Sequence, residues 1–403
     1  MLKRAISFLL ILGILISIFA NLIPVQAADF DNAAALGIYM NRKFADIQAK
    51  AYAVYDCNHD QFIALKNSDE KRQVASLVKM MTVYIAFEYI RLGYLNLSDT
   101  ITTSIKAENT PGATVYISAG DTFSVESALY AIIIGSYNDA TVALAERIAL
   151  TEADFVDLMN LHAKSIGMLN TNFVDCTGID DAGYTTAYDM ALLSNVIVKN
   201  YFDDYMKISK KRYDETIFKN GTGKFTLYNT NNYLKFVPAS DGLKVGSTLS
   251  AMYCIAATYQ EDGRRLIVVM LGASSENDLY AETRRAFDYC LAYYTYEEIQ
   301  KDGELVTDEI KVKKGVSKTV SCSIKGSFSR VLTADEKKKV IKETELPNSL
   351  DAPLSAGDVI GKAIYKIDDQ VICELDIVLD EDVEKAGWFQ IFIEWLLEWF
   401  GFA

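Results

Sequence analysis

Hydrophobic and polar residues follow different periods along this chain, and these periods predict its helices and strands. Short runs rich in strand-forming residues predict a strand pair over 51–56 and 62–65, with a turn at 58–60. A segment from Ser76 to Leu92, apolar on nearly all sides, predicts a buried helix. Further helices are expected in a block ending at Leu150 and over 154–166, 186–198 and 281–294, and further strands over 242–245, 252–258 and 266–272.

The order of these elements predicts the class of fold. Strands, then a block of helices, then strands again indicate an α+β domain with helices packed on an antiparallel sheet. The pattern changes near residue 300, after which turn residues separate short strands at 319–324, 363–367 and 371–378. We therefore expect an α+β domain over 28–300 and a small all-β domain over 305–386.

The first 27 residues (1–27) are predicted to be a secretory signal peptide. Lys3 and Arg4 precede an uninterrupted apolar run from Ala5 to Ala20, and small residues near Ala27 form a cleavage site. The alternative is an uncleaved N-terminal anchor, against which Pro24 and the cleavage pattern argue. We therefore expect an exported protein.

The last segment, 387–403, is predicted to be an amphipathic helix that associates with a membrane surface. It holds all three tryptophans, and Gln390, Glu394 and Glu398 form one polar stripe on it. About 16 residues are too few to span a bilayer, whereas a tryptophan-rich helix suits the membrane interface. The acidic stripe counts against this interpretation, and the alternative is a C-terminal helix docked on the protein.

Charge limits the partners of the chain. Its 403 residues include 40 Lys and Arg against 54 Asp and Glu, and loss of Lys3 and Arg4 with the signal peptide changes the net charge from −14 to −16. Nucleic-acid backbones are bound by clustered positive charge, so no nucleic-acid partner is expected. The one basic cluster, Lys337 to Lys339, is interpreted as a solvated loop.

Cysteine and histidine usage gives no indication of metal or cofactor chemistry. The six cysteines form no C-x-x-C pair, which argues against zinc, and their 15 possible pairings stay open, although their apolar surroundings favour small buried side chains. His59 lies in a predicted turn and His162 on a mixed helix, and both are interpreted as surface residues. No metal and no cofactor are expected, and a nucleophile here would need a base other than imidazole.

The first candidate motif is S-x-x-K at Ser76 and Lys79. The two residues lie three apart at the start of the buried helix and therefore share a face. A serine hydroxyl needs a neighbour to take its proton, and a lysine desolvated at a dry helix start has a lowered pKa and can be that base. The alternative makes Ser76 an N-cap and Lys79 a surface residue.

Two further motifs supply polar groups beside apolar runs. Ser136 and Asn138 follow the run ending at Gly135, where a hydroxyl and a carboxamide can relay a proton and hold a substrate amide; alone, this pattern is more typical of a cap or turn. Lys244 lies in a strand-like run that ends at Gly246. There a cation can face a substrate carboxylate while the glycine permits close backbone approach.

In this order and spacing, the three motifs resemble those of the low-molecular-mass penicillin-binding proteins, the serine-type D-alanyl-D-alanine carboxypeptidases. The resemblance covers nearly the whole chain after residue 27 and implies a β-lactamase-like transpeptidase fold followed by the family's β-rich domain and membrane helix. Further segments that carry it include 73–76, 111–112, 119–121, 138–146, 184–190, 229–231 and 241–244.

The resemblance also implies a reaction and its residues. Ser76 would attack the carbonyl between the two terminal D-alanines of a peptidoglycan stem peptide, with Lys79 as base, and water would hydrolyse the acyl-enzyme. Backbone N–H groups of Ser76 and Ser247 would form the oxyanion hole, and Lys244 would lie near the substrate carboxylate. β-Lactam antibiotics would acylate the same serine at the outer face of the bacterial cytoplasmic membrane.

Three positions depart from the family pattern. The middle residue of K-x-G is Val245, where the family has Thr or Ser, and valine cannot donate a hydrogen bond to the substrate carboxylate. Thr248 could supply part of that role. Met252 replaces a common glycine, and Tyr137 is bulky for S-x-N. A catalytically weak wall-binding or scaffolding protein is therefore the alternative function, and a secreted β-lactamase is a weaker one.

Overall fold

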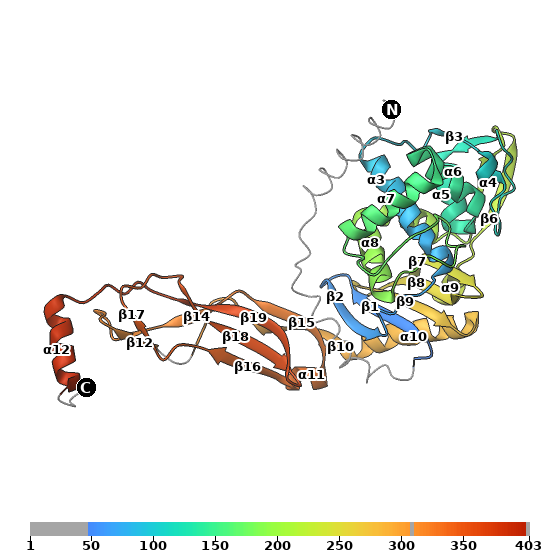
Figure 1. Ribbon diagram of the computed structural model, residues 1–403. Helices are drawn as coiled ribbons and strands as arrows, with labels where there is room; N and C mark the ends of the chain where they lie inside the picture. Colours follow the sequence, from blue (N-terminus) through green and yellow to red (C-terminus); the bar gives the residue numbers. More distant parts are fainter. Residues whose placement is uncertain (1–46, 307–309, 400–403) are drawn as a thin grey trace, which may run out of the picture. The chain divides into compact units, whose positions relative to one another are not determined.

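The computed structural model describes residues 47–306 and 310–399 (Figure 1). The chain divides into two compact units, Met1–Cys290 and Leu291–Ala403, which are described separately. The division falls about ten residues before the boundary expected near 300, because the strand over 294–300 pairs within the second unit. The segment 1–27, predicted to be a signal peptide, lies outside the described residues.

The first unit is built on a five-stranded antiparallel sheet with the strand order β2-β1-β9-β8-β7. The strands are β1 (Ala51–Asp56), β2 (Gln61–Lys66), β7 (Ser240–Thr248), β8 (Met252–Glu261) and β9 (Arg264–Ala273). The first two strands pair across a turn, as predicted. Pairing of β1 with β9 then joins segments about 200 residues apart in the chain and leaves β7 at one edge.

Both faces of this sheet are covered, which explains why β9 is an almost continuous apolar run instead of an alternating one. Val269 and Leu271 face the main core shared with the helices. Met270, between them, points to the other face, where its sulfur contacts the hydroxyl of Thr283 on α10 (Glu276–Tyr293). The predicted α+β class, with helices on an antiparallel sheet, is confirmed.

Besides α10, several helical segments of the first unit surround or flank the apolar helix predicted from Ser76. They are η2 (Ala75–Val78), α3 (Lys79–Arg91), α4 (Ile105–Glu108), α5 (Val125–Tyr130), η3 (Ala131–Gly135), α6 (Asn138–Ala149), α7 (Glu152–Ser165), α8 (Ala187–Ser209) and α9 (Tyr233–Phe236). Every residue of α3 from Lys79 to Tyr89 is buried. The helix therefore runs through the core instead of lying on it (Figure 1).

Two small strand pairs of this unit were not predicted. They are β3 (Thr100–Thr102) with β4 (Thr122–Ser124), and β5 (Tyr213–Phe218) with β6 (Gly223–Tyr228). In the second pair Tyr213, Ile217 and Tyr228 are exposed, so its sequence lacks the alternation of apolar and polar residues that marks a half-buried strand.

The second unit is mostly β-structure, as predicted. Its strands are β10 (Tyr294–Gln300), β11 (Glu304–Leu305), β12 (Ile310–Lys313), β13 (Thr319–Val320), β14 (Cys322–Lys325), β15 (Phe328–Thr333), β16 (Val340–Glu345), β17 (Ser349–Asp351), β18 (Val359–Ile367) and β19 (Gln370–Leu379). The largest sheet has the order β11-β14-β19-β18-β16. Buried side chains such as Ile324, Tyr365 and Ile377 form its core.

The interpretation of Lys337 to Lys339 as a loop is wrong. Ala334–Lys338 form the short helix α11, which Thr333 begins with a complete capping box to Glu336. The capping box satisfies two backbone N–H groups at the start of the helix. At the other end, the positive charges of the lysines stabilise the helix through its dipole.

The last described helix, α12 (Trp388–Trp399), lies within the segment predicted to be amphipathic. Trp388, Phe389, Phe392 and Ile393 are exposed on it. Within residues 47–306 and 310–399, no helix is both long enough and apolar enough to cross a membrane.

Candidate active site

The nucleophile candidate lies on a tight turn that leads into the buried helix. The 3-10 turn η2 contains Ser76, and α3 begins at Lys79, which is only 1% exposed. Neither η2 nor α3 is capped by a side-chain hydrogen bond. The alternative in which Ser76 is an N-cap and Lys79 a surface residue is therefore wrong.

Lys79 and Ser76 are within hydrogen-bonding distance. The Nζ atom of Lys79 lies 2.9 Å from Ser76 Oγ and donates to the backbone oxygen of Thr177 over 2.7 Å. Burial lowers the pKa of Lys79 to about 8, although Cys176 and Asp175 partly oppose this shift. At pH 7 about one Lys79 in ten is then neutral, against about one in three thousand for an ordinary lysine. The residue is suited to act as a base.

Lys244 is a second buried lysine close to the first. It lies on β7, is 2% exposed, and donates to its neighbour's carbonyl, the backbone oxygen of Val245, over 3.1 Å. Burial lowers the pKa of Lys244 well below its ordinary value, and repulsion from Lys79 adds to this. A ligand carboxylate placed beside Lys244 would favour its protonated form, since an opposite charge stabilises an ammonium.

The S-x-x-K and K-x-G motifs meet where β7 passes η2. A Cβ added to Gly246 would lie 2.7 Å from the backbone nitrogen of Ser76, closer than real Cβ atoms approach. Only glycine permits this contact without displacement of the strand or the turn. The next residue, Ser247, is exposed, so its part of the strand is accessible to a ligand.

The S-x-N motif contributes buried polar atoms whose hydrogen bonds are not satisfied by the described residues. Ser136 follows η3 with a left-handed backbone (φ +60°), and among the described residues its buried Oγ has no hydrogen-bond partner. The amide of Asn138 donates to Pro111 O over 2.7 Å, while its Oδ1 also lacks a partner. Buried groups left unsatisfied are costly, and a bound substrate could satisfy them. Because η3 packs against α3, this motif lies near the Ser76 helix.

At Val245, β7 lacks the hydroxyl that the family has at this position. The nearby hydroxyls, those of Ser247 and Thr248, lie on different faces of the strand. Side chains alternate along β7, so Val245 shares a face with Ser247, whereas Thr248 lies on the face of Lys244 and Gly246. The Thr248 hydroxyl also accepts the N–H of Ala251 over 3.0 Å, within the turn to β8. Ser247 is therefore the nearer stand-in for the missing hydroxyl.

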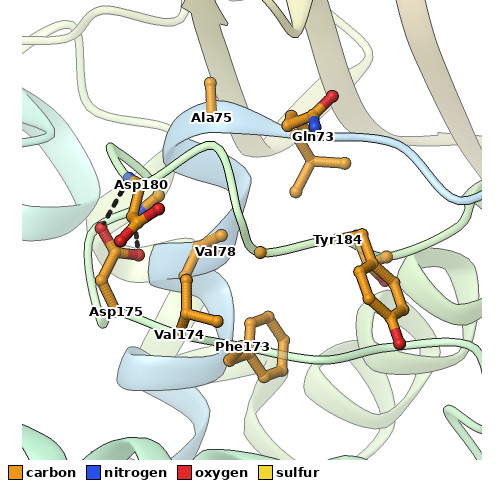
Figure 2. Close-up of a pocket in the computed structure, with 12 residues that line it drawn as sticks. Gln73, Ala75, Val78, Phe173, Val174, Asp175, Asp180 and Tyr184 are labelled. Atoms are coloured by element: carbon orange, nitrogen blue, oxygen red, sulfur yellow. Dashed lines mark hydrogen bonds between the residues drawn. The ribbon is translucent and has the colours of Figure 1, made fainter.

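The loop over 175–180 was missed in the sequence because its main contribution to the site is a backbone carbonyl, that of Thr177. Figure 2 shows this loop beside η2, around a pocket with about 20 Å³ of enclosed space, room for a single water molecule. Asp175 forms hydrogen bonds within the loop, as the dashed lines show. An Asp followed three residues later by a Gly, as at Asp175 and Gly178, is the signal that could have marked this turn.

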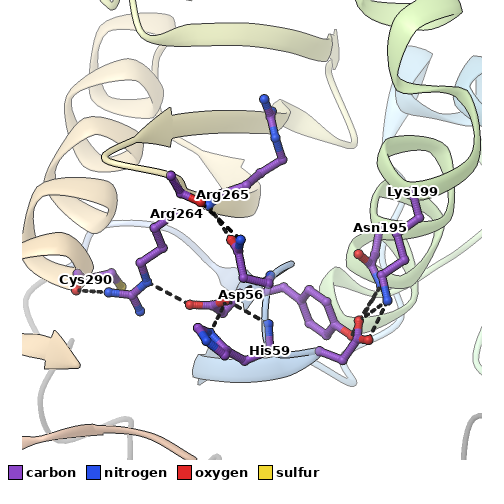
Figure 3. Close-up of polar contacts among 11 residues, drawn as sticks. Asp56, His59, Asn195, Lys199, Arg264, Arg265 and Cys290 are labelled. Carbon is purple, nitrogen blue, oxygen red and sulfur yellow. Dashed lines mark hydrogen bonds and ion pairs between the residues drawn. The ribbon is translucent and has the colours of Figure 1, made fainter. Parts of the chain in front are cut away.

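A second polar cluster, around Asp56, supports the fold (Figure 3). The fully buried carboxylate of Asp56 accepts the N–H of His59 over 3.1 Å, lies 2.9 Å from its ring Nδ1, and pairs with Arg264 Nε over 2.7 Å. Arg264 also donates to Cys290 O over 3.3 Å. These contacts tie the β1–β2 turn, where His59 was predicted, to β9 and to α10.

His162 is not the surface residue expected. It is 2% exposed, with its ring edge-on to Tyr84, because α7 turns this side toward α3. Burial lowers the pKa of His162 to about 4, so it is neutral at physiological pH. Four of the six cysteines are buried. The described residues contain no cluster of His, Cys, Asp and Glu that could hold a metal ion.

Comparison with protein families finds two matches. The D-alanyl-D-alanine carboxypeptidase family matches residues 39–275, and the family of the penicillin-binding protein 5 C-terminal domain matches residues 294–385. The first match alone covers more than half of the chain.

Individual relatives resemble the chain over both units. It is 32% identical to D-alanyl-D-alanine carboxypeptidase DacF of Bacillus subtilis over 87% of this chain and 90% of that protein. The crystal structure of D-alanyl-D-alanine carboxypeptidase DacD from Francisella tularensis superimposes with a TM-score of 0.72 at 27% identity, over 84% of this chain and 94% of that one. Ampicillin-bound penicillin-binding protein D2 of Listeria monocytogenes has a TM-score of 0.54 at 27% identity, over 60% and 97% of the two chains.

The contact between β7 and η2 can be tested by Gly246→Ala. The added methyl group would displace Ser76 or the strand, so we expect labelling of the protein by a fluorescent penicillin to slow about 100-fold. The free energy of unfolding should fall by about 1–3 kcal/mol, measured by urea denaturation. Gly387→Ala is the matched control, since a Cβ there meets nothing within 4 Å. Unchanged labelling of Gly246→Ala would show that the close contact is not required.

Proposed function

The chain belongs to the D-alanyl-D-alanine carboxypeptidase family, and from this premise we propose that Ser76 is its nucleophile and Lys79 its general base. It is a serine-type, penicillin-binding carboxypeptidase of cell-wall peptidoglycan, with stem peptides as substrates and β-lactams as ligands implied by the family. The single observation that supports the proposed pair is the contact of 2.9 Å between the fully buried amine of Lys79 and Ser76 Oγ.

Acylation begins with transfer of the Ser76 proton to neutral Lys79. The Ser76 oxygen then forms a bond to the carbonyl carbon between the two D-alanines, and the negative charge on the carbonyl oxygen is stabilised by the N–H groups of Ser76 and Ser247. When the intermediate collapses, the C–N bond breaks and the leaving nitrogen takes a proton, so that D-alanine departs as an amine. Water hydrolyses the ester of Ser76 in the second half of the reaction.

Ser136, Asn138 and Lys244 complete the proposed site. The unpartnered Oγ of Ser136 is suited to relay the proton from Lys79 to the leaving nitrogen, and the free Oδ1 of Asn138 is suited to accept a substrate N–H. Lys244 recognises the terminal carboxylate, which favours its protonated state. The two buried lysines repel as cations, so a protonated Lys244 would disfavour the protonated form of Lys79. Substrate binding therefore favours the basic form of Lys79.

The alternative function, a catalytically weak wall-binding protein, rests on Val245. Loss of its hydroxyl affects recognition of the carboxylate and leaves the acylating residues in place. We propose that the protein is an active carboxypeptidase whose carboxylate recognition is weakened at this position.

We also propose that residues 1–27 are a cleaved signal peptide and that the C-terminal helix holds the enzyme at the outer face of the cytoplasmic membrane. Two observations support the second proposal. Trp388 and Phe389 are 80% and 62% exposed, and their rings would be covered by the membrane interface. Family membership supports action on the cell wall.

The proposed function is tested by Ser76→Ala and Lys79→Arg. Both variants should lose labelling by a fluorescent penicillin and release of D-alanine from a synthetic pentapeptide. Arginine keeps the positive charge but cannot act as a base, so its failure separates base catalysis from charge. Lys235→Arg, at an exposed lysine, is the control and should retain full activity. Undiminished labelling of Ser76→Ala would place the nucleophile elsewhere.

Carboxylate recognition is tested by Val245→Thr. A hydrogen bond to a charged group is worth on the order of 1.5–3 kcal/mol, so kcat/KM for D-Ala-D-Ala peptides should rise roughly 10- to 150-fold. The steady-state rate of D-alanine release measures it. Ser247→Ala and Thr248→Val, made in the native protein, show whether either hydroxyl already fills the role. No effect from any of the three changes would leave recognition to Lys244 alone and would contradict the proposal.

Membrane association is tested by deletion of 388–403 in cells that produce the protein. The truncated protein should move from the membrane fraction to the soluble fraction, with penicillin labelling intact, because the deletion removes the exposed apolar side chains of α12. Phe389→Ser with Phe392→Ser should give a partial release, and Gln390→Ala none. Retention of the truncated protein on membranes would assign the anchoring to the N-terminal segment.

A further inference from the structure

The carboxylate of Asp175 organises a tight turn over residues 175–180. Its Oδ1 accepts the N–H of Gly178 over 2.7 Å. Its Oδ2 accepts the hydroxyl of Thr177 and the N–H of Ile179, each over 2.9 Å, and the N–H of Asp180 over 3.1 Å. One side chain thus fixes four groups of the following five residues, and Figure 2 shows it turned toward Asp180.

The same turn lies directly against the helix that carries the nucleophile. The backbone oxygen of Thr177 accepts Lys79 Nζ over 2.7 Å, and the preceding carbonyl, of Cys176, accepts the Thr82 hydroxyl over 2.9 Å. The backbone of Gly178 packs so closely on η2 that an added Cβ would lie 2.0 Å from the backbone oxygen of Ala75. Three successive residues of the turn therefore contact η2 or α3.

The contact with the Thr177 carbonyl determines how the amine of Lys79 is oriented. A carbonyl oxygen can only accept, so one N–H of Lys79 must point at Thr177. A neutral amine held in this way can direct its lone pair at Ser76 Oγ, 2.9 Å from the nitrogen. If the carbonyl moved away, the amine would be free to rotate, and the geometry of proton transfer would be lost.

We propose that Asp175 is a positioning residue for the general base, because its carboxylate holds the Thr177 carbonyl in place against Lys79. This inference rests on the proposed function, in which neutral Lys79 accepts the proton of Ser76. Asp175 itself touches neither substrate nor nucleophile, and it acts through the backbone of the turn.

Because charged groups surround Lys79, the proposed role of Asp175 should be visible in the dependence of the acylation rate on pH. Asp175 and Cys176 from the turn are the titratable groups that shift the pKa of Lys79, and Lys79 in turn lowers the pKa of Lys244 on β7. Burial lowers the pKa of Lys79, and the negative charge of Asp175 raises it. Removal of that charge with the turn intact should lower the pKa of Lys79 further, whereas a loosened turn that admits water should raise it.

The experiment compares Asp175→Asn and Asp175→Ala in the whole protein. Second-order rate constants for acylation by a fluorescent penicillin are measured between about pH 6 and pH 10. Asparagine keeps one of the two acceptor oxygens, so Asp175→Asn should retain more of the rate at high pH than Asp175→Ala does, and the rise of its rate with pH should be displaced to lower pH. Alanine removes the acceptor, and Asp175→Ala should be slowed about 10- to 100-fold. Asp180→Asn, the same charge change in the same turn, is the matched control and should behave as the native protein.

Three outcomes would overturn the inference: a native rate and pH profile for Asp175→Ala, an acid limb of Asp175→Asn that stays in place or moves to higher pH, or the same displacement in Asp180→Asn. Circular dichroism checks that the variants are folded, and Asp175→Asn decides the question if Asp175→Ala is not. Failure of the proposed function gives a different result, since Ser76→Ala would then be labelled like the native protein, or the native protein would not be acylated at all.

Discussion

The exclusion of water from the Lys79 amine is the constraint on which the site depends. A pKa lowered from 10.5 to about 8 corresponds to a cost of about 3 kcal/mol at neutral pH, which the surrounding core has to offset. The core does so with an α3 helix whose residues from Lys79 to Tyr89 are all buried and which packs against α6, α7 and α8. The mostly apolar sequence after Ser76 thus serves the proposed chemistry as well as the fold, because a half-exposed helix would leave Lys79 solvated and protonated.

The edge position of β7 allows a ligand to approach Lys79 even though the amine is shielded from water. An edge strand can pack against η2 through Gly246 and still present Ser247 to solvent. The same strand brings Lys244 into the neighbourhood of Lys79, so that the two amines share one poorly solvated region and cannot both carry charge without repulsion. A carboxylate that enters at this edge changes the protonation balance of both residues. In the proposed mechanism, this repulsion couples recognition of the carboxylate to activation of the base.

The sequence predicts those parts of the fold and of the site that depend on residues close together in the chain. Ser76 and Lys79 are three residues apart on one helix, and the β1–β2 pair is joined by a short turn, so both follow from spacing alone. The meeting of β7 with η2 could be expected only through the family resemblance, because it joins segments about 170 residues apart. The burial of His162 and the contact of Thr177 with Lys79 were missed, since tertiary packing decides the first and a backbone atom makes the second. The carboxylate of Asp175 escaped notice because its partners are backbone N–H groups.

The free energy of unfolding is lowered by the buried polar groups of this site, and this helps to distinguish an enzyme from a scaffolding protein. A protein that only bound the cell wall would be stabilised by apolar replacements for two buried lysines, because neither is compensated by a buried carboxylate within hydrogen-bonding distance. The unpartnered Oγ of Ser136 adds a further cost that binding through an outer surface would not need. In the proposed mechanism, each of these costly groups has a step to perform in acyl transfer. Strain and desolvation concentrated in one place are typical of an active site that trades stability for reactivity. Val245, in contrast, lies on β7 and takes no part in the contact between Ser76 and Lys79, so under the proposed function its lost hydroxyl affects substrate affinity and not the acylating residues.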